Sequence, residues 1–181
     1  MKTLIDHLLL FDDLNDWQIE LIETVTHRMR LKEGSYFTEP GHTYPQLAFI
    51  ESGVLRYNYY NRKVENITSS FIEEGNFIAG TGSLPIALPQ SEFIQAVTDC
   101  TLLVIGKDAL EQISATVTNW GAILKKILQK ATTARQKRSI GITEATVPHE
   151  EAERYLHTFE GLNKHLTLQQ ITPYFTMPGS N

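Results

Sequence analysis

The chain has 181 residues, 41% of them hydrophobic and 20% charged, which is typical of a soluble globular protein with one large or two small domains. This composition excludes wholesale disorder, and no apolar run approaches the roughly 20 residues that a membrane-spanning helix needs. Met1–Asp6 places an acid inside what would be the apolar stretch of a signal peptide, so we expect a cytoplasmic protein. A single cysteine, Cys100, excludes a disulfide framework within the chain and a cysteine-rich metal site.

The net charge of −5 is distributed unevenly along the chain. Residues 1–115 hold 8 Lys and Arg against 16 Asp and Glu, whereas residues 116–181 hold 8 against 5. An acidic body therefore precedes a mildly basic tail. Such asymmetry is a weak indication that the basic part meets nucleic acid.

The first 30 residues are predicted to be helical. Apolar residues between Trp17 and Val25 form one face beside charged residues such as Glu20, and Asp16 stands where an N-cap is expected.

From about Leu31 to Ile105 the pattern changes to short strands separated by glycine turns, because glycine adopts positive φ without a steric penalty. Short strands at this spacing, without long helices between them, predict an antiparallel barrel or sandwich. The predicted strands, which are rich in β-branched and aromatic residues, are Gln46–Ile50, Val54–Tyr60, Asn66–Ile72, Phe93–Thr98 and Thr101–Ile105.

Helical periodicity returns after Lys107. Asp108–Ile113 predicts a short helix, and an apolar stripe from about Val117 to Ser139 predicts a helix of roughly 35 Å. Because this helix is longer than one open face of a small barrel, we expect two copies of the chain to pair through the stripe; the alternative is a helix that packs along its own domain. The residues expected at the dimer interface are Trp120, Ile123, Leu124, Ile127, Leu128 and Ala131.

Two shorter helices are predicted in the tail. The first begins at Thr146-Val147-Pro148, since proline suits the first turn of a helix, and it stops at Gly161. The second begins at about Thr167 and is disturbed by Pro173.

Six short motifs occur in a recognisable order: Leu31–Gly34, Glu39–Gly41, Phe49–Arg56, Phe71–Ile78, Glu153–Leu156 and Leu168–Phe175. With this order of elements, the chain from about Leu31 to Asn181 resembles the Crp/Fnr superfamily of cyclic-nucleotide-binding transcription regulators. The resemblance implies an α+β fold with an N-terminal helix, an antiparallel β-roll (a double-stranded β-helix), a long dimerisation helix and a partial winged helix-turn-helix.

The resemblance also implies a division of the chain. We expect a sensor domain at residues 1–115, a dimerisation helix with a linker at 116–145, and part of a DNA-binding domain at 146–181. The implied partners are a second copy of the chain, DNA and an unidentified small-molecule effector.

In the resembled family, a Phe-Gly-Glu turn and a later Arg-Ser pair bind the ribose and the cyclic phosphate, because the arginine fork matches phosphate oxygens. Here Gly80 stands at the glutamate position and Gln90 at the arginine position. Glu92 follows and would repel a phosphate, although strand alternation puts it on the face opposite Ser91. We therefore expect no cyclic AMP binding in the family's manner and a neutral or weakly polar ligand instead. Micromolar binding of a cyclic nucleotide would mean that another residue fills the arginine's role, and a basic residue of the long helix is the first candidate. The residues expected in the effector pocket are Phe77, Ile78, Ala79, Gly80, Thr81, Gly82, Gln90 and Ser91.

The end of the chain is similar to the start of the family's helix-turn-helix, whose second helix enters the major groove. Because the rest of that second helix would lie beyond Asn181, we expect a truncated motif that binds DNA without sequence selectivity. The residues expected to meet DNA are Gln169, Gln170, Thr176, Gly179, Ser180 and Asn181.

No enzyme, metal site or cofactor is predicted. A cupin would need a second histidine where Tyr44 follows His42, and neither a nucleophile elbow nor a P-loop occurs. Two functions stay open: a DNA-binding regulator whose β-roll senses a small effector, and a β-roll module for a ligand or protein that has lost both cyclic-nucleotide and DNA binding.

Overall fold

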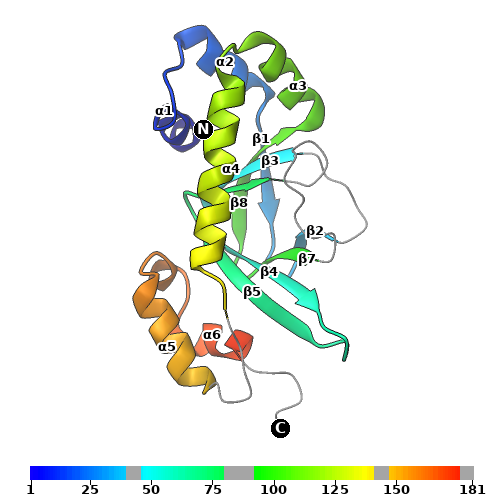
Figure 1. Ribbon diagram of the computed structural model, residues 1–181, viewed down its shortest axis with the longest axis vertical. Helices are drawn as coiled ribbons and strands as arrows, with labels where there is room; N and C mark the ends of the chain where they lie inside the picture. The colour runs from blue at the N-terminus through cyan, green and yellow to red at the C-terminus, as the bar shows by residue number, and fades with distance from the viewer. Residues whose placement is uncertain (40–45, 80–91, 141–146, 176–181) are drawn as a thin grey trace.

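The computed structural model describes residues 1–39, 46–79, 92–140 and 147–175. Two antiparallel sheets of four strands form a roll, and one long helix, α4 (Trp120–Lys137), runs along it (Figure 1). Helices α1 to α3 gather near the N-terminal end of α4, and the tail helices lie beyond its C-terminal end.

One sheet has the strand order β1-β8-β3-β6, and the other has the order β2-β7-β4-β5. The interior between them is apolar and includes Ile50, Leu55 and Ile94. This architecture confirms the predicted β-roll. The strands are β1 (His27–Leu31), β2 (Tyr36–Thr38), β3 (Gln46–Ser52), β4 (Val54–Tyr60), β5 (Asn66–Glu73), β6 (Phe77–Ala79), β7 (Glu92–Ala96) and β8 (Cys100–Gly106).

Strands β1, β2 and β6 were missed by the sequence analysis, and the helical prediction for residues 27–30 was wrong. In β1 the exposed Arg28 and Arg30 alternate with Met29 and Leu31, which pack against the interior of the roll. Four residues are too few for this period to stand out in the sequence, and β1 pairs with β8 in the sheet. β2 and β6 have only three residues each, which is too short for a period to be visible.

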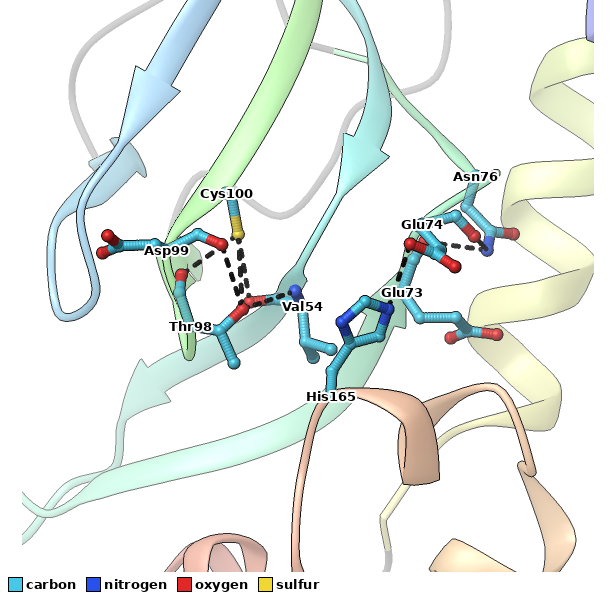
Figure 2. Close-up of polar contacts among 8 residues, drawn as sticks. All are labelled: Val54, Glu73, Glu74, Asn76, Thr98, Asp99, Cys100 and His165. Atoms are coloured by element: carbon cyan, nitrogen blue, oxygen red, sulfur yellow. Dashed lines mark hydrogen bonds and ion pairs between the residues drawn. The ribbon is translucent and has the colours of Figure 1, made fainter. Parts of the chain in front are cut away.

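The turn between β3 and β4 depends on Gly53. Its φ is +95°, and a Cβ atom there would lie 2.6 Å from the Asp99 carbonyl oxygen and 2.7 Å from the Cys100 sulfur. Cys100 is buried, and its thiol donates to the carbonyl oxygens of Thr98 at 3.2 Å and Val54 at 3.4 Å (Figure 2). Burial raises the pKa of this thiol, so Cys100 is a small core residue.

Three further helices surround the first half of α4: α1 (Lys2–Leu9), α2 (Asp16–Val25) and α3 (Lys107–Thr116). The N-cap of α2 is Asn15, not the predicted Asp16. Asn15 and Gln18 form a capping box, in which each side chain accepts a hydrogen bond from the other residue's backbone N–H at 2.9 Å.

The apolar stripe of α4 is buried by the chain's own residues. Trp120, Ile123 and Ile127 are fully buried against α1, α3 and the roll, and Leu128 is 7% exposed. Leu124 packs against the same core and Ala131 is half-buried. The reason for expecting these residues at an interface between two copies was therefore wrong, because α1 to α3 extend the domain far enough to cover them. The homodimer itself stays a prediction.

The tail packs on the outer face of β4 and β5. It consists of α5 (Pro148–Thr158), η1 (Leu162–Lys164), α6 (Leu168–Ile171) and η2 (Thr172–Phe175). Phe71 of β5 lies at the centre, with its ring centroid 5.7 Å from Tyr155 and 5.6 Å from Tyr174. Figure 2 shows His165 beside Glu74, with His165 Nε2 and Glu74 Oε2 3.1 Å apart. A helix was predicted from about Thr167, and α6 begins at Leu168 with Thr167 as its N-cap.

Candidate functional site

A polar cavity of about 470 Å³ lies between strand β5 and the C-terminal half of α4. Two consecutive serines of β5 face four polar residues from the last turns of α4 and the residues that follow. The lining residues are Ser69, Ser70, Thr132, Arg135, Gln136 and Ser139.

The two serines occupy an irregular point of the sheet. β5 pairs with β4 through Tyr57↔Ser70 and then Asn58↔Thr68, so Ser69 is the extra residue of a β-bulge. Ser70 is 1% exposed, and its hydroxyl has no hydrogen-bond partner among the described residues. A buried hydroxyl without a partner is destabilising, and its residue lines a cavity large enough to hold a small molecule or several waters.

Ser69 connects the cavity with the segment that follows α4. Its hydroxyl donates to Glu92 Oε1 at 3.0 Å, and its carbonyl oxygen accepts a hydrogen bond from the backbone N–H of Ile140 at 2.8 Å.

Arg135 is the only basic residue that lines the cavity within the described part of the chain. Its guanidinium forms an ion pair with Glu92 of β7, and its Cζ lies 4.4 Å from the centroid of the Tyr57 ring. The side chains of Arg135 and Glu92 are 25% and 9% exposed. Burial raises the pKa of Tyr57 to about 12, so the ring beneath Arg135 stays neutral. The pair therefore brings no net charge to the cavity.

A second ion pair lies one turn further along the helix. Arg138, which follows α4 directly, pairs with Glu73 of β5, and its Cζ lies 5.2 Å from the centroid of the Phe159 ring. The Tyr155 hydroxyl of α5 donates to the Arg138 carbonyl oxygen at 2.8 Å. The end of α4 is thus attached to the roll on one side and to the tail on the other.

The residues predicted for the effector pocket are only partly described. Phe77 and Ile78 are buried in two different apolar cores, and Ala79 pairs with Leu47 in the sheet. These three do not line the cavity. The other predicted residues, Gly80, Thr81, Gly82, Gln90 and Ser91, lie outside the described residues.

The cavity residues were missed by the sequence analysis. Two signals were present in the sequence. Ser69 and Ser70 interrupt a strand of otherwise mostly apolar or β-branched residues, and Arg135 falls on the edge of the apolar stripe of α4. Glu92 was expected on the strand face opposite Ser91. In the structure it pairs with Tyr59 and lies on the same side as Ile94, toward the interior and Arg135.

Two of the residues predicted to meet DNA are among the described residues. Gln169 and Gln170 are exposed on α6, and the Gln170 side chain accepts a hydrogen bond from the Thr167 backbone N–H at 2.9 Å. Thr176, Gly179, Ser180 and Asn181 lie outside the described residues.

Two searches of the described residues give negative results. They contain no group of three or more His, Cys, Asp or Glu placed to hold a metal ion. None of their helices combines the length and the apolar character needed to cross a membrane.

Residues 28–116 match the protein family described as the cyclic nucleotide-binding domain, and the two sheets have the fold of that domain. No curated protein matches the chain. A solved cyclic nucleotide-binding domain from Methylobacillus flagellatus is 18% identical with a TM-score of 0.63, and the match covers 87% of this chain and 83% of that one.

Regulators are also among the similar solved structures. One described as a putative transcriptional regulator of the Crp/Fnr family, from Eubacterium rectale, is 16% identical with a TM-score of 0.60, covering 94% of this chain and 81% of that chain. The sensor domain of the transcriptional regulator DNR from Pseudomonas aeruginosa is 17% identical with a TM-score of 0.57. This match covers 75% of this chain and 89% of that chain. At these identities the likeness concerns the fold.

Proposed function

We propose that this protein is a Crp/Fnr-type transcription regulator whose β-roll binds a small effector in the cavity between β5 and α4. In this proposal residues 1–115 sense the effector, residues 116–145 connect and dimerise, and residues 146–181 contribute to DNA binding. The domain family and the regulators among the similar folds support a regulatory rather than an enzymatic role.

The observation that carries the proposal is the buried residue Ser70, which lines the cavity and whose hydroxyl has no partner among the described residues. A ligand that accepted a hydrogen bond from Ser70 would remove the penalty of leaving this donor unpaired. Arg135, Gln136 and the hydroxyls of Thr132 and Ser139 supply further polar contacts at the same place.

The position of the cavity suits a sensor because its walls continue into the tail. Ser69 contacts Glu92 through its side chain and Ile140 through its backbone. Arg135 lies one turn before Arg138, which contacts α5 through its carbonyl oxygen. A ligand that moved the last turn of α4 would therefore move the attachment of the tail.

The effector that fits this proposal is not a cyclic nucleotide. A cyclic phosphate needs an unpaired positive charge or several N–H donors, and Arg135 is already paired with Glu92. Calorimetry with cyclic AMP and cyclic GMP should show no heat of binding at micromolar concentration. A dissociation constant in that range for either nucleotide would contradict this part of the proposal.

The cavity itself can be tested by a thermal-shift screen of uncharged polar compounds against the wild type. Compounds that stabilise the wild type should lose most of their effect in Ser70→Val and Gln136→Leu. The matched control is Gln112→Leu, because Gln112 is also an exposed helical glutamine but lies on α3, away from the cavity. Equal losses in the control variant would show that the compounds bind elsewhere.

Homodimerisation is the second part of the proposal. Sedimentation of the wild-type protein over a range of concentrations should show a dimer. A monomer at every concentration would remove dimerisation from the proposal.

One observation favours the alternative function, a β-roll module without DNA binding. Ile171 and Phe175, which belong to the segment that resembles the first helix of a helix-turn-helix, are buried against the chain's own roll. Selection from a random pool of DNA duplexes at physiological salt separates the two functions. Enrichment of a palindromic sequence supports the regulator, and recovery of no DNA above background supports the module.

A further inference from the structure

We infer that Glu92 is the specificity determinant of the cavity: its carboxylate occupies the anion-binding position of Arg135 and thereby restricts the site to uncharged ligands. This inference rests on the proposed function only in taking the cavity as a ligand site.

The guanidinium of Arg135 has the chemical capacity to bind an anion. A guanidinium offers five N–H donors in a planar fork that matches carboxylate and phosphate oxygens. The Arg135 side chain is 25% exposed, its Cζ lies 4.4 Å from the centroid of the neutral Tyr57 ring, and the residue lines the cavity. A cation held in this way at the wall of a polar cavity is suited to bind an oxyanion.

In the structure, the carboxylate of Glu92 occupies the anion-binding position of Arg135. One oxygen of Glu92 contacts Arg135, and the other accepts a hydrogen bond from Ser69 at 3.0 Å. Both oxygens therefore have partners. The Glu92 side chain is 9% exposed, whereas most carboxylates remain in water. The protein supplies here, from its own chain, the negative charge that an anionic ligand would bring.

Displacing Glu92 from Arg135 by an incoming anion carries a free-energy penalty. An incoming anion could bind Arg135 only by displacing Glu92, which would leave a buried carboxylate without its cation and beside a second negative charge. Removing one partner of a buried ion pair is strongly destabilising, so the exchange is unfavourable at any ordinary ligand concentration.

These contacts define the chemistry of the ligand that the cavity accepts. Next to the Arg135–Glu92 pair, the buried Ser70 hydroxyl has no partner among the described residues, and the exposed Gln136 side chain lines the same cavity. An uncharged molecule with neighbouring donor and acceptor groups, such as an amide, a polyol or a heterocyclic base without a phosphate, can meet both without disturbing the pair.

The test is the response to inorganic phosphate, measured as a shift of the melting temperature at constant ionic strength. Glu92→Gln keeps the shape of the side chain and its acceptor for Ser69, but it removes the charge that neutralises Arg135. We expect this variant to bind phosphate 10- to 150-fold more tightly than the wild type, the effect of roughly one charge-assisted contact. At a phosphate concentration ten times the dissociation constant, the melting temperature should rise by about 3–5 °C.

Two further variants make the test specific. Glu73→Gln removes the carboxylate of the other ion pair of this helix, beside Arg138, and should give no phosphate response above that of the wild type. The double variant Glu92→Gln with Arg135→Gln should lose the response gained by Glu92→Gln alone. A folded Glu92→Gln protein that responds no more than the wild type overturns the inference, as does an equal response in Glu73→Gln or in the double variant. If the proposed effector function is wrong, uncharged compounds fail to bind the wild type, and this failure leaves the phosphate result unchanged.

Discussion

The two halves of α4 are held to the roll in different ways. The N-terminal half buries Trp120, Ile123 and Ile127 completely in an apolar core. The C-terminal half and the residue after it are attached through the ion pairs of Arg135 with Glu92 and Arg138 with Glu73. The hydrophobic effect is non-directional and depends on the apolar area buried. The strength of an ion pair depends on its geometry and on the charges nearby.

Under the proposed function, this difference places the response to a ligand in the C-terminal half of the helix. The apolar half fixes the helix to the β-roll, and the charged half lies at the cavity and next to the tail. A change in the ion pairs could therefore alter the tail without unfolding the core.

Trp120→Ala should cause the largest loss, about 3–5 kcal/mol in the free energy of unfolding, because it leaves a cavity in the core of the first half. Urea denaturation measures this loss. Trp120→Phe is the matched control and should lose much less, since the indole N–H has no hydrogen-bond partner among the described residues. Similar losses for the two variants would mean that the indole has an unrecognised polar contact.

Arg138→Ala should lower the free energy of unfolding by about 3 kcal/mol, because Glu73, with a side chain only 11% exposed, would lose its cation. The second oxygen of Glu73 already has no partner among the described residues. The double variant Arg138→Met with Glu73→Leu should recover most of the stability. If Arg138→Ala costs less than about 1 kcal/mol, the pair behaves as an exposed one and the contrast between the halves fails.

Tyr155→Phe should have a local effect of about 1 kcal/mol, the usual contribution of one hydrogen bond. The variant removes the hydroxyl that donates to the Arg138 carbonyl oxygen. Amide hydrogen exchange should become faster in α5 and α6 and stay unchanged in the first half of α4. Faster exchange in both regions would show that the tail and the apolar core unfold together.

Gly121→Ala should give the smallest effect, a stabilisation of up to about 0.5 kcal/mol. Gly121 lies in the first turn of α4, and a Cβ atom there would meet no other atom within 4 Å. Thermal unfolding measures the gain, and a loss of stability would show that this surface is covered in solution.

The sequence by itself determined the β-roll and the order of the elements. Val54–Tyr60 was predicted with its observed bounds because β-branched and aromatic residues that directly follow a glycine turn specify a strand locally. Pro148 and the Thr167 cap fixed the starts of two tail helices for the same reason: a cap or an N-terminal proline acts within one turn.

Only the tertiary structure decided what α4 covers and what lines the cavity. The apolar stripe is the same pattern whether a helix packs on its own domain or on a second copy, and α1 to α3 provide the cover within one chain. Glu92 and Arg135 are 43 residues apart in the sequence, so no local pattern could join them. Their pairing follows from the register of β7 on β4 and from the path of α4 across the roll, because an ion pair depends on distance in space and not on separation along the chain.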